Sequence, residues 1–133
     1  MSLLIDTSVW IAFFRHHSTP ISRRFAELVG RDRDAILGCP VVHLELSLDS
    51  DDLRRRRILR VYDGFPATGI EASDFELAGD LYRAVRQRGH TIRAPDCLIA
   101  AAALRSDATI IHTDVDFDRL SATLPRLSTR RLD

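Results

Sequence analysis

Three acidic residues directly follow an apolar run near the end of this 133-residue chain. Residues 109–111, Thr-Ile-Ile, lead into the stretch HTDVDFDRL, which carries Asp114, Asp116 and Asp118. Two unit charges about 4 Å apart repel by roughly 4 kcal/mol at an effective dielectric constant of about 20, so converging acids need a compensating partner. Clusters of carboxylates with few His or Cys neighbours select hard cations such as Mg²⁺ and Mn²⁺. This segment is therefore a candidate metal site.

Three more acids stand where they can reach the same place. Asp6 directly follows the apolar run 3–5, Asp96 lies in the first turn of a helix opened by Pro95, and Glu45 lies in the helix that follows the second expected strand. Binding sites of parallel sheets lie beyond the carboxyl ends of the strands. We therefore predict one cleft shared by five carboxylates, those of Asp6, Glu45, Asp96, Asp114 and Asp116.

Each of these acids also has a purely structural interpretation. Asp6 could serve only as a helix cap, and Asp96 only as an acid that satisfies a helix dipole. Glu45 could be a solvated helix residue. One cap cannot explain both Asp114 and Asp116, and the joint placement of the acids at one sheet edge favours a shared site.

Other acid-rich sites fit the chain less well. All 19 basic residues are arginine, whereas receiver domains and haloacid-dehalogenase-type phosphatases depend on a lysine near the phosphoryl group. An EF-hand loop starting at Asp114 would have Arg119 at its glycine position and Pro125 at its glutamate position, which excludes that motif. Asp118 is then expected to be an exposed acid of a first helical turn.

Zinc chemistry is also disfavoured. His43 and His112 are isolated, and a lone histidine in an apolar segment is more often a packed one. Cys39 and Cys97 lie far apart and match no zinc or redox spacing, so we expect both to be core thiols.

Strands and helices alternate along the chain, which predicts an α/β protein with a parallel sheet covered on both faces. Strands are expected at 3–5, 35–37, 65–70, 109–112 and 127–129. Helices are expected at 9–17, 20–29 (closed by Gly30), 41–48, 54–62, 74–88 (opened by a Ser73–Glu76 capping box and ended by Gly89), 96–106 and 117–120.

Composition and charge limit the function classes. The chain is 45% hydrophobic and 29% charged, which is typical of a globular protein, and its length predicts a single domain over residues 1–133. No apolar run approaches the roughly 20 residues of a membrane-spanning helix, and the N-terminus lacks the basic start of a signal peptide, so a cytoplasmic protein is expected. The net charge is zero, so no global positive field recruits nucleic acid.

Local arginine groups remain candidate RNA contacts. They are Arg54–Arg57 with Arg60, and Arg83, Arg86, Arg88 and Arg93. A solvated face or a protein interface is the favoured interpretation of such helical runs. Aromatic residues at helical spacing near the N-terminus, Trp10, Phe13 and Phe14, are expected in the core or in a dimer surface.

Four stretches together carry a family resemblance: LLIDTSVWIAFF, HLEL, APDCLIAAAAL and IIHTDVDFDRL. In this order and spacing they resemble the motifs of PIN-domain ribonucleases, specifically VapC-type toxins of bacterial toxin–antitoxin pairs. The resemblance runs from about residue 2 to residue 131. The segment LSLDS after Glu45 departs from the family, whose members often carry a glycine there, so the end of that helix is the least determined boundary.

The resemblance implies a PIN-like three-layer α/β/α fold with a central parallel sheet of four to five strands. It implies that Asp6, Glu45, Asp96 and Asp114 form an acidic quartet, with Asp116 as a fifth acid. The implied ligands of Mg²⁺ or Mn²⁺ are Asp6, Asp96, Asp114 and Asp116. The hydroxyls of Ser8 and Thr113 would support these ligands.

The same resemblance implies a function. It is the metal-assisted hydrolysis of RNA phosphodiester bonds without a protein nucleophile. The implied partners are RNA, a cognate VapB-like antitoxin and a second copy of the chain, in the bacterial cytoplasm. The alternative is a non-catalytic PIN-like module that binds RNA or protein.

Overall fold

The computed structural model describes residues 1–15 and 18–133; the predicted helix ending at His17 therefore extends partly outside the described residues. The elements follow one another in the order β1 (Ser2–Ile5), α1 (Thr7–Arg15), α2 (Pro20–Asp32), the 3-10 turn η1 (Arg33–Ala35), β2 (Ile36–Leu37), α3 (Pro40–Ser47), α4 (Asp52–Tyr62), α5 (Ala72–Gln87), α6 (Ala94–Arg105), β3 (Ala108–His112), α7 (Val115–Thr123) and β4 (Thr129–Arg131).

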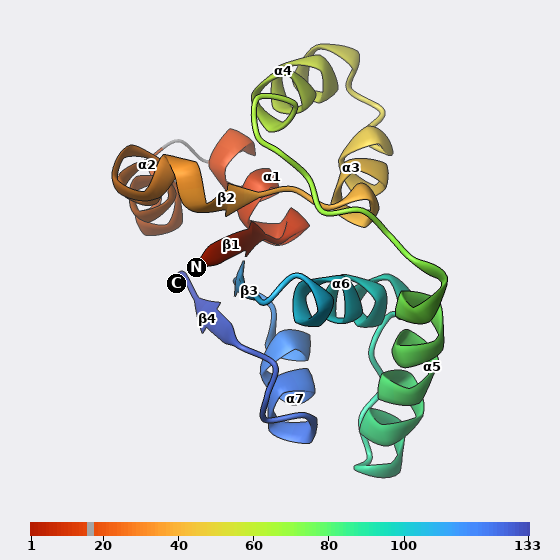
Figure 1. Ribbon diagram of the computed structural model, residues 1–133. Helices are drawn as coiled ribbons and strands as arrows, with labels where there is room; N and C mark the ends of the chain where they lie inside the picture. The colour runs from red at the N-terminus through yellow and green to blue at the C-terminus, as the bar shows by residue number, and fades with distance from the viewer. Residues whose placement is uncertain (16–17) are drawn as a thin grey trace.

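The sheet is parallel throughout and has the strand order β2-β1-β3-β4. Leu4 of β1 pairs with Leu37 on one side and with Ile110 of β3 on the other. Figure 1 shows α2 on one side of the sheet and α6 and α7 on the other. The predicted three-layer α/β/α arrangement with four parallel strands is confirmed.

The chain leaves the two central strands in opposite directions. After β1 it runs through α1 and α2 to β2 at one edge, and after β3 it runs through α7 to β4 at the other edge. Such a reversal opens a crevice beyond the carboxyl ends of the two strands, where open α/β sheets bind ligands. The residues that follow β1 and β3 are therefore the ones that face the crevice.

The core has the composition that doubly covered strands require. Leu4 and Ile5 of β1 and Ile110 and Ile111 of β3 have no exposed surface. The alanines of α6, residues 100–103, are equally buried, and their small side chains let this helix approach β3 closely. No helix of the described residues is long and apolar enough to cross a membrane.

One predicted strand is absent. Residues 65–70 contribute only an isolated parallel bridge between Gly38 and Ala67, with hydrogen bonds from Gly38 N to Pro66 O (2.7 Å) and from Thr68 N to Gly38 O (2.9 Å). Pro66 has no N–H group and cannot donate to a strand ladder. The segment therefore lies beside the end of β2 without continuing the sheet.

Two boundaries also differ from the predicted ones. Helix α2 continues through Gly30 to Asp32, so this glycine does not end it. Strand β4 begins at Thr129, because Leu127 closes a turn onto Leu124 O before the strand starts. Gly89, in contrast, follows α5 with a φ of +88°, as expected of a residue that ends a helix.

The predicted capping box of α5 is wrong, because the observed box lies two residues earlier in the chain. The box is formed by Glu71 and Asp74, not by Ser73 and Glu76, and the helix begins at Ala72. Asp74 is almost fully buried and accepts hydrogen bonds from Arg105 of α6 at 3.0 Å. This contact between helices selects Asp74 for the cap.

A buried tyrosine fixes the start of α3. The Tyr62 hydroxyl donates to Cys39 O and accepts from Cys39 N, both at 2.8 Å. Gly38 lies so close to it that a Cβ there would stand 2.6 Å from the Tyr62 oxygen. The end of α4 thus holds the helix that carries Glu45.

Tyr62→Phe should lower the free energy of unfolding by about 1–3 kcal/mol, because it leaves the buried Cys39 N–H without a partner. Urea denaturation measures the change. Tyr82→Phe is the matched control, since its hydroxyl only receives a 3.5 Å contact from Arg86 at the surface. Equal effects of the two substitutions would contradict the anchoring role of Tyr62.

Candidate metal centre

The five predicted acids come together beyond the carboxyl ends of β1 and β3. Carboxylate oxygens of one group of three lie within 4.8 Å of one another, and so do those of a second group. The groups share Asp96. The first consists of Asp6, Glu45 and Asp96, and the second of Asp96, Asp114 and Asp116.

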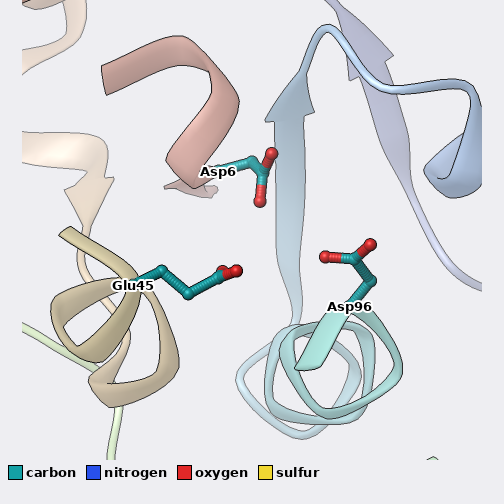
Figure 2. A group of neighbouring side chains, drawn as sticks. All are labelled: Asp6, Glu45 and Asp96. Carbon is teal, nitrogen blue, oxygen red and sulfur yellow. The ribbon is translucent and has the colours of Figure 1, made fainter. Parts of the chain in front are cut away.

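The first group is assembled from three separate elements. Figure 2 shows Asp6 at the junction of β1 and α1, Glu45 on α3 and Asp96 on α6, with their carboxylates directed toward a common space. A cavity of about 360 Å³ opens there, with the hydroxyl residues Thr7 and Ser8 in its lining. The site is therefore an open acidic pocket.

Asp6 is both a cap and a member of the cluster. Its Oδ2 accepts hydrogen bonds from Ser8 N at 3.0 Å and Ser8 Oγ at 2.6 Å, as a cap does. Its Oδ1 is buried and has no hydrogen-bond partner among the described residues. Burial raises the pKa of this carboxyl despite the hydrogen bonds from Ser8. The two interpretations of Asp6 are thus compatible, because each uses a different oxygen.

Asp96 is the most strongly perturbed acid. Its residue surface is only 4% exposed, and its Oδ2 is buried without a hydrogen bond among the described residues. Burial, followed by the charge of Asp6, raises its pKa to about 7. A carboxylate at this position lacks the solvation that would stabilise its charge.

Glu45 is held at both oxygens. Thr7 Oγ1 donates to Oε1 at 2.8 Å, and the Arg93 guanidinium donates to Oε2. Nothing in the sequence position of Thr7, except its place beside Asp6, indicates a bond to a residue 38 positions away. Glu45 thus leans over the pocket as predicted, with a partner that the sequence did not reveal.

The acids that follow β3 are partly exposed. Asp114 Oδ1 caps α7 by accepting from Asp116 N at 2.9 Å, and Asp116 pairs with Arg119 at 3.2 Å. Thr113 N donates to Ser8 Oγ at 3.3 Å, which ties the end of β3 to the start of α1. The Ser8 hydroxyl therefore supports Asp6 as expected, whereas Thr113 contacts Ser8 through its backbone N–H and not through the hydroxyl that was expected to contribute.

Other candidate residues lie outside the cluster. Asp118 pairs with Arg131 of β4 at 2.5 Å, as a half-exposed first-turn acid. His112 is fully buried and accepts from Asp114 N, and both cysteines are buried and free. None of these belongs to a metal-type group of the described residues.

Most arginines of α4 are engaged by nearby acids. Arg54 makes two hydrogen bonds to Asp49, and Arg55 and Arg56 pair with Asp52. These contacts favour the interpretation of the arginine run as a solvated, self-paired face.

The donors fit a hard divalent cation. Both groups contain carboxylates only, and oxygen ligands are those that hard divalent cations such as Mg²⁺ and Mn²⁺ prefer, whereas structural zinc sites are built mainly from Cys and His. The two buried oxygens without partners, Asp6 Oδ1 and Asp96 Oδ2, are costly unless a cation or a proton satisfies them. A bound cation would also offset the mutual repulsion of the acids.

Known proteins resemble this chain in sequence and in fold. The sequence model of the PIN domain matches residues 3–122. Over 119 residues the chain is 38% identical to VapC ribonuclease Mb1587 of Mycobacterium bovis and to ribonuclease VapC11 of Mycobacterium tuberculosis, covering 87% of this chain and 89% of each relative. The structure of VapBC2 from Rickettsia felis, bound to a DNA fragment from its promoter, matches all of both chains with a TM-score of 0.76 and 19% identity.

Proposed function

Because the chain belongs to the PIN-domain family, we propose that it is a Mg²⁺-dependent endoribonuclease that acts as the toxin of a toxin–antitoxin pair. The relatives named ribonuclease VapC support this activity. The observation that carries the proposal is a pair of buried oxygens that accept no hydrogen bond from the described residues, Asp6 Oδ1 and Asp96 Oδ2, inside a convergent set of five acids. A protein that used these acids only for folding would have satisfied them with hydrogen bonds.

The acidic residues have two proposed roles, metal binding and orientation of the attacking water. Asp6, Asp96, Asp114 and Asp116 would hold the ion: Asp96 belongs to both groups, Asp6 to the first, and Asp114 and Asp116 to the second. When bound, the ion supplies a Lewis acid that activates water and offsets the charge developing on the phosphate. Glu45, fixed by Thr7 and Arg93, is assigned to orienting the attacking water by a hydrogen bond.

No cysteine is available as a protein nucleophile. Burial raises the pKa of Cys97 to about 11 and also raises that of Cys39. A thiolate is the reactive form, so neither side chain is activated. This agrees with hydrolysis by water.

The proposed partners follow from the same relatives. Structural neighbours are described as VapBC complexes, which supports a VapB-like antitoxin as partner. RNA as substrate, a homodimer and a location in the bacterial cytoplasm complete the proposal. Light scattering of the purified protein tests the dimer. The alternative, a non-catalytic PIN-like module, requires that the intact acid set have no activity.

Mg²⁺ or Mn²⁺ should raise the melting temperature, and EDTA should stop RNA cleavage. A ligand at a hundred times its Kd stabilises the folded state by about 2.7 kcal/mol, which corresponds to a shift on the order of 10 °C for a domain of this size. KCl at matched ionic strength is the control for screening. Full activity in EDTA, with no tightly held metal found by elemental analysis, would rule out the mechanism.

A further inference from the structure

The acidic pocket carries negative charge, and a bound metal ion alone does not explain how an anionic substrate approaches it. Its lining contains the carboxylates of Asp6, Glu45, Asp96 and Asp114. An RNA phosphodiester is itself an anion, so these acids repel the group that must approach them. Arg93 is the one basic side chain among the described residues that line the pocket.

The backbone fixes where the Arg93 side chain begins. Arg93 is the N-cap residue of α6, and its carbonyl accepts hydrogen bonds from Asp96 N at 3.1 Å and Cys97 N at 3.4 Å. From this position the side chain crosses toward α3 and donates to Glu45 Oε2. Its Nε lies 3.9 Å from Asp96 Oδ2. The guanidinium thus stands at the rim, between two acids of the cluster.

The Arg93 contacts leave most of its hydrogen-bonding capacity free. A guanidinium has five N–H donors, and Arg93 makes one hydrogen bond to the described residues. Its side chain is 60% exposed. Arg105 offers a contrast, because it is tied to Asp74, Thr68 and Gly69 by several hydrogen bonds.

Stability alone does not account for this arginine. An ion pair with so exposed a partner contributes only about 0–1 kcal/mol, and Thr7 already holds the other oxygen of Glu45. A planar guanidinium that lies beside a cleft and has unused N–H groups is well suited to bind phosphate oxygens.

We propose that Arg93 is a substrate-binding residue that contacts a phosphate oxygen of RNA at the rim of the acidic pocket. This role rests on the proposed nuclease function and adds a residue to the acidic set. Arg93 keeps its bond to Glu45 through one N–H group and offers the others to the substrate. It thereby admits an anion to a site that would otherwise repel it.

The experiment compares wild type with Arg93→Ala, Arg93→Lys and Arg31→Ala on a single-stranded RNA substrate at several KCl concentrations. Loss of a charge-assisted phosphate contact should raise KM roughly 10- to 100-fold, with a smaller change in kcat. The slope of log affinity against log salt should fall by about 1. Arg93→Lys should recover part of the loss. Arg31, an exposed arginine of α2 paired with Asp32, should show no effect.

Two readouts separate substrate binding from a structural role. The Mn²⁺-induced shift in melting temperature should persist in Arg93→Ala, since Glu45 keeps its bond to Thr7. Loss of that shift together with activity would mean that Arg93 only positions the acids, and would overturn the proposal. Unchanged KM and salt slope in Arg93→Ala would overturn it as well.

A binding assay keeps the test independent of cleavage. Fluorescence anisotropy measures the binding of labelled RNA in the presence of Ca²⁺. If wild type cleaves no RNA, the nuclease function fails, while weaker RNA binding by Arg93→Ala would still support the contact. Equal binding by wild type and Arg93→Ala would reject the contact even in an active enzyme.

Discussion

Asp96→Asn is expected to abolish RNA cleavage and growth inhibition while leaving a folded protein that is more stable than wild type in the absence of metal. Asp96 belongs to both groups of acids, so its loss removes a ligand from each. The amide preserves the shape of the side chain in a site that is 4% exposed. It removes the charge that binds the cation and that repels Asp6.

The gain in stability should depend on pH. Burial and the Asp6 charge raise the pKa of Asp96 to about 7 in the folded protein, above its value of about 3.9 in an unfolded chain. A raised pKa means that the folded state holds the proton more tightly, so this carboxyl favours folding at low pH and loses that contribution as pH rises to about 7. The advantage of Asp96→Asn should therefore grow between about pH 4 and pH 7 and level off above. Urea denaturation of the metal-free proteins measures it.

Asp118→Asn is the matched control for the activity measurement. Asp118 lies only four residues from Asp114 in the loop and helix after β3, but it pairs with Arg131 outside the cluster. It should keep most of the wild-type activity. An inactive Asp118 variant would show that the cluster is misassigned, and an unfolded Asp96 variant would identify Asp96 as a structural cap.

The positions of these acids could be predicted from the sequence where an acid lies next to a strand or helix that the sequence indicates. Asp6 directly follows β1, and Asp114 is the second residue after the neighbouring parallel strand β3, so their positions follow from the strands alone. The position of Asp96 follows from Pro95, which lies in the first turn of α6. Local patterns suffice for these residues because each is placed by the element beside it.

Tertiary contacts decided what local patterns could not. The tilt of α3, which places Glu45, depends on the bonds of Tyr62 to Cys39 across 23 residues. The cap of α5 moved to Asp74 because Arg105, 31 residues away, binds that acid. The spacing of residues in the sequence reveals neither the contact of Tyr62 with Cys39 nor that of Arg105 with Asp74.

The absent strand at 65–70 has a different cause. Its apolar and β-branched residues fit a strand, and residue 67 does form a bridge with Gly38, which directly follows β2. Pro66 limits the pairing to that bridge, because proline cannot donate a hydrogen bond to a strand ladder. This effect outweighs the hydrophobic pattern of the segment. The sheet consequently has four strands, at the lower end of the predicted range.

The isolated C-terminal peptide of the cognate antitoxin is expected to inhibit cleavage, and replacing its site-binding arginine or lysine with alanine should weaken inhibition at least about 10-fold. The bond between Arg93 and Glu45 supports this, because it is a guanidinium–carboxylate pair already formed at the pocket. A second cation from a bound peptide would find further acids there, including the partnerless oxygens of Asp6 and Asp96.

An apolar groove beside the acidic pocket would hold the rest of such a peptide. The groove has a volume of about 700 Å³ and shares Glu45 and Arg93 with the pocket. Leu44, Leu48 and Phe75 line it and are 58%, 72% and 61% exposed. Exposed apolar surface of this kind favours a protein ligand, and a peptide that folds onto it from a disordered state loses conformational entropy on binding.

Competition with Mg²⁺ distinguishes the two ways in which the peptide can inhibit. If its cation occupies the carboxylate cluster, raising Mg²⁺ should relieve inhibition, because both cations need the same oxygens. The alanine variant of the peptide, which can still occupy the groove, should inhibit weakly and without dependence on Mg²⁺. Initial cleavage rates over a matrix of peptide and Mg²⁺ concentrations, at constant ionic strength, measure this. Inhibition by the unmodified peptide that stays constant at every Mg²⁺ concentration would instead assign the effect to occlusion of the RNA path by the groove-bound segment.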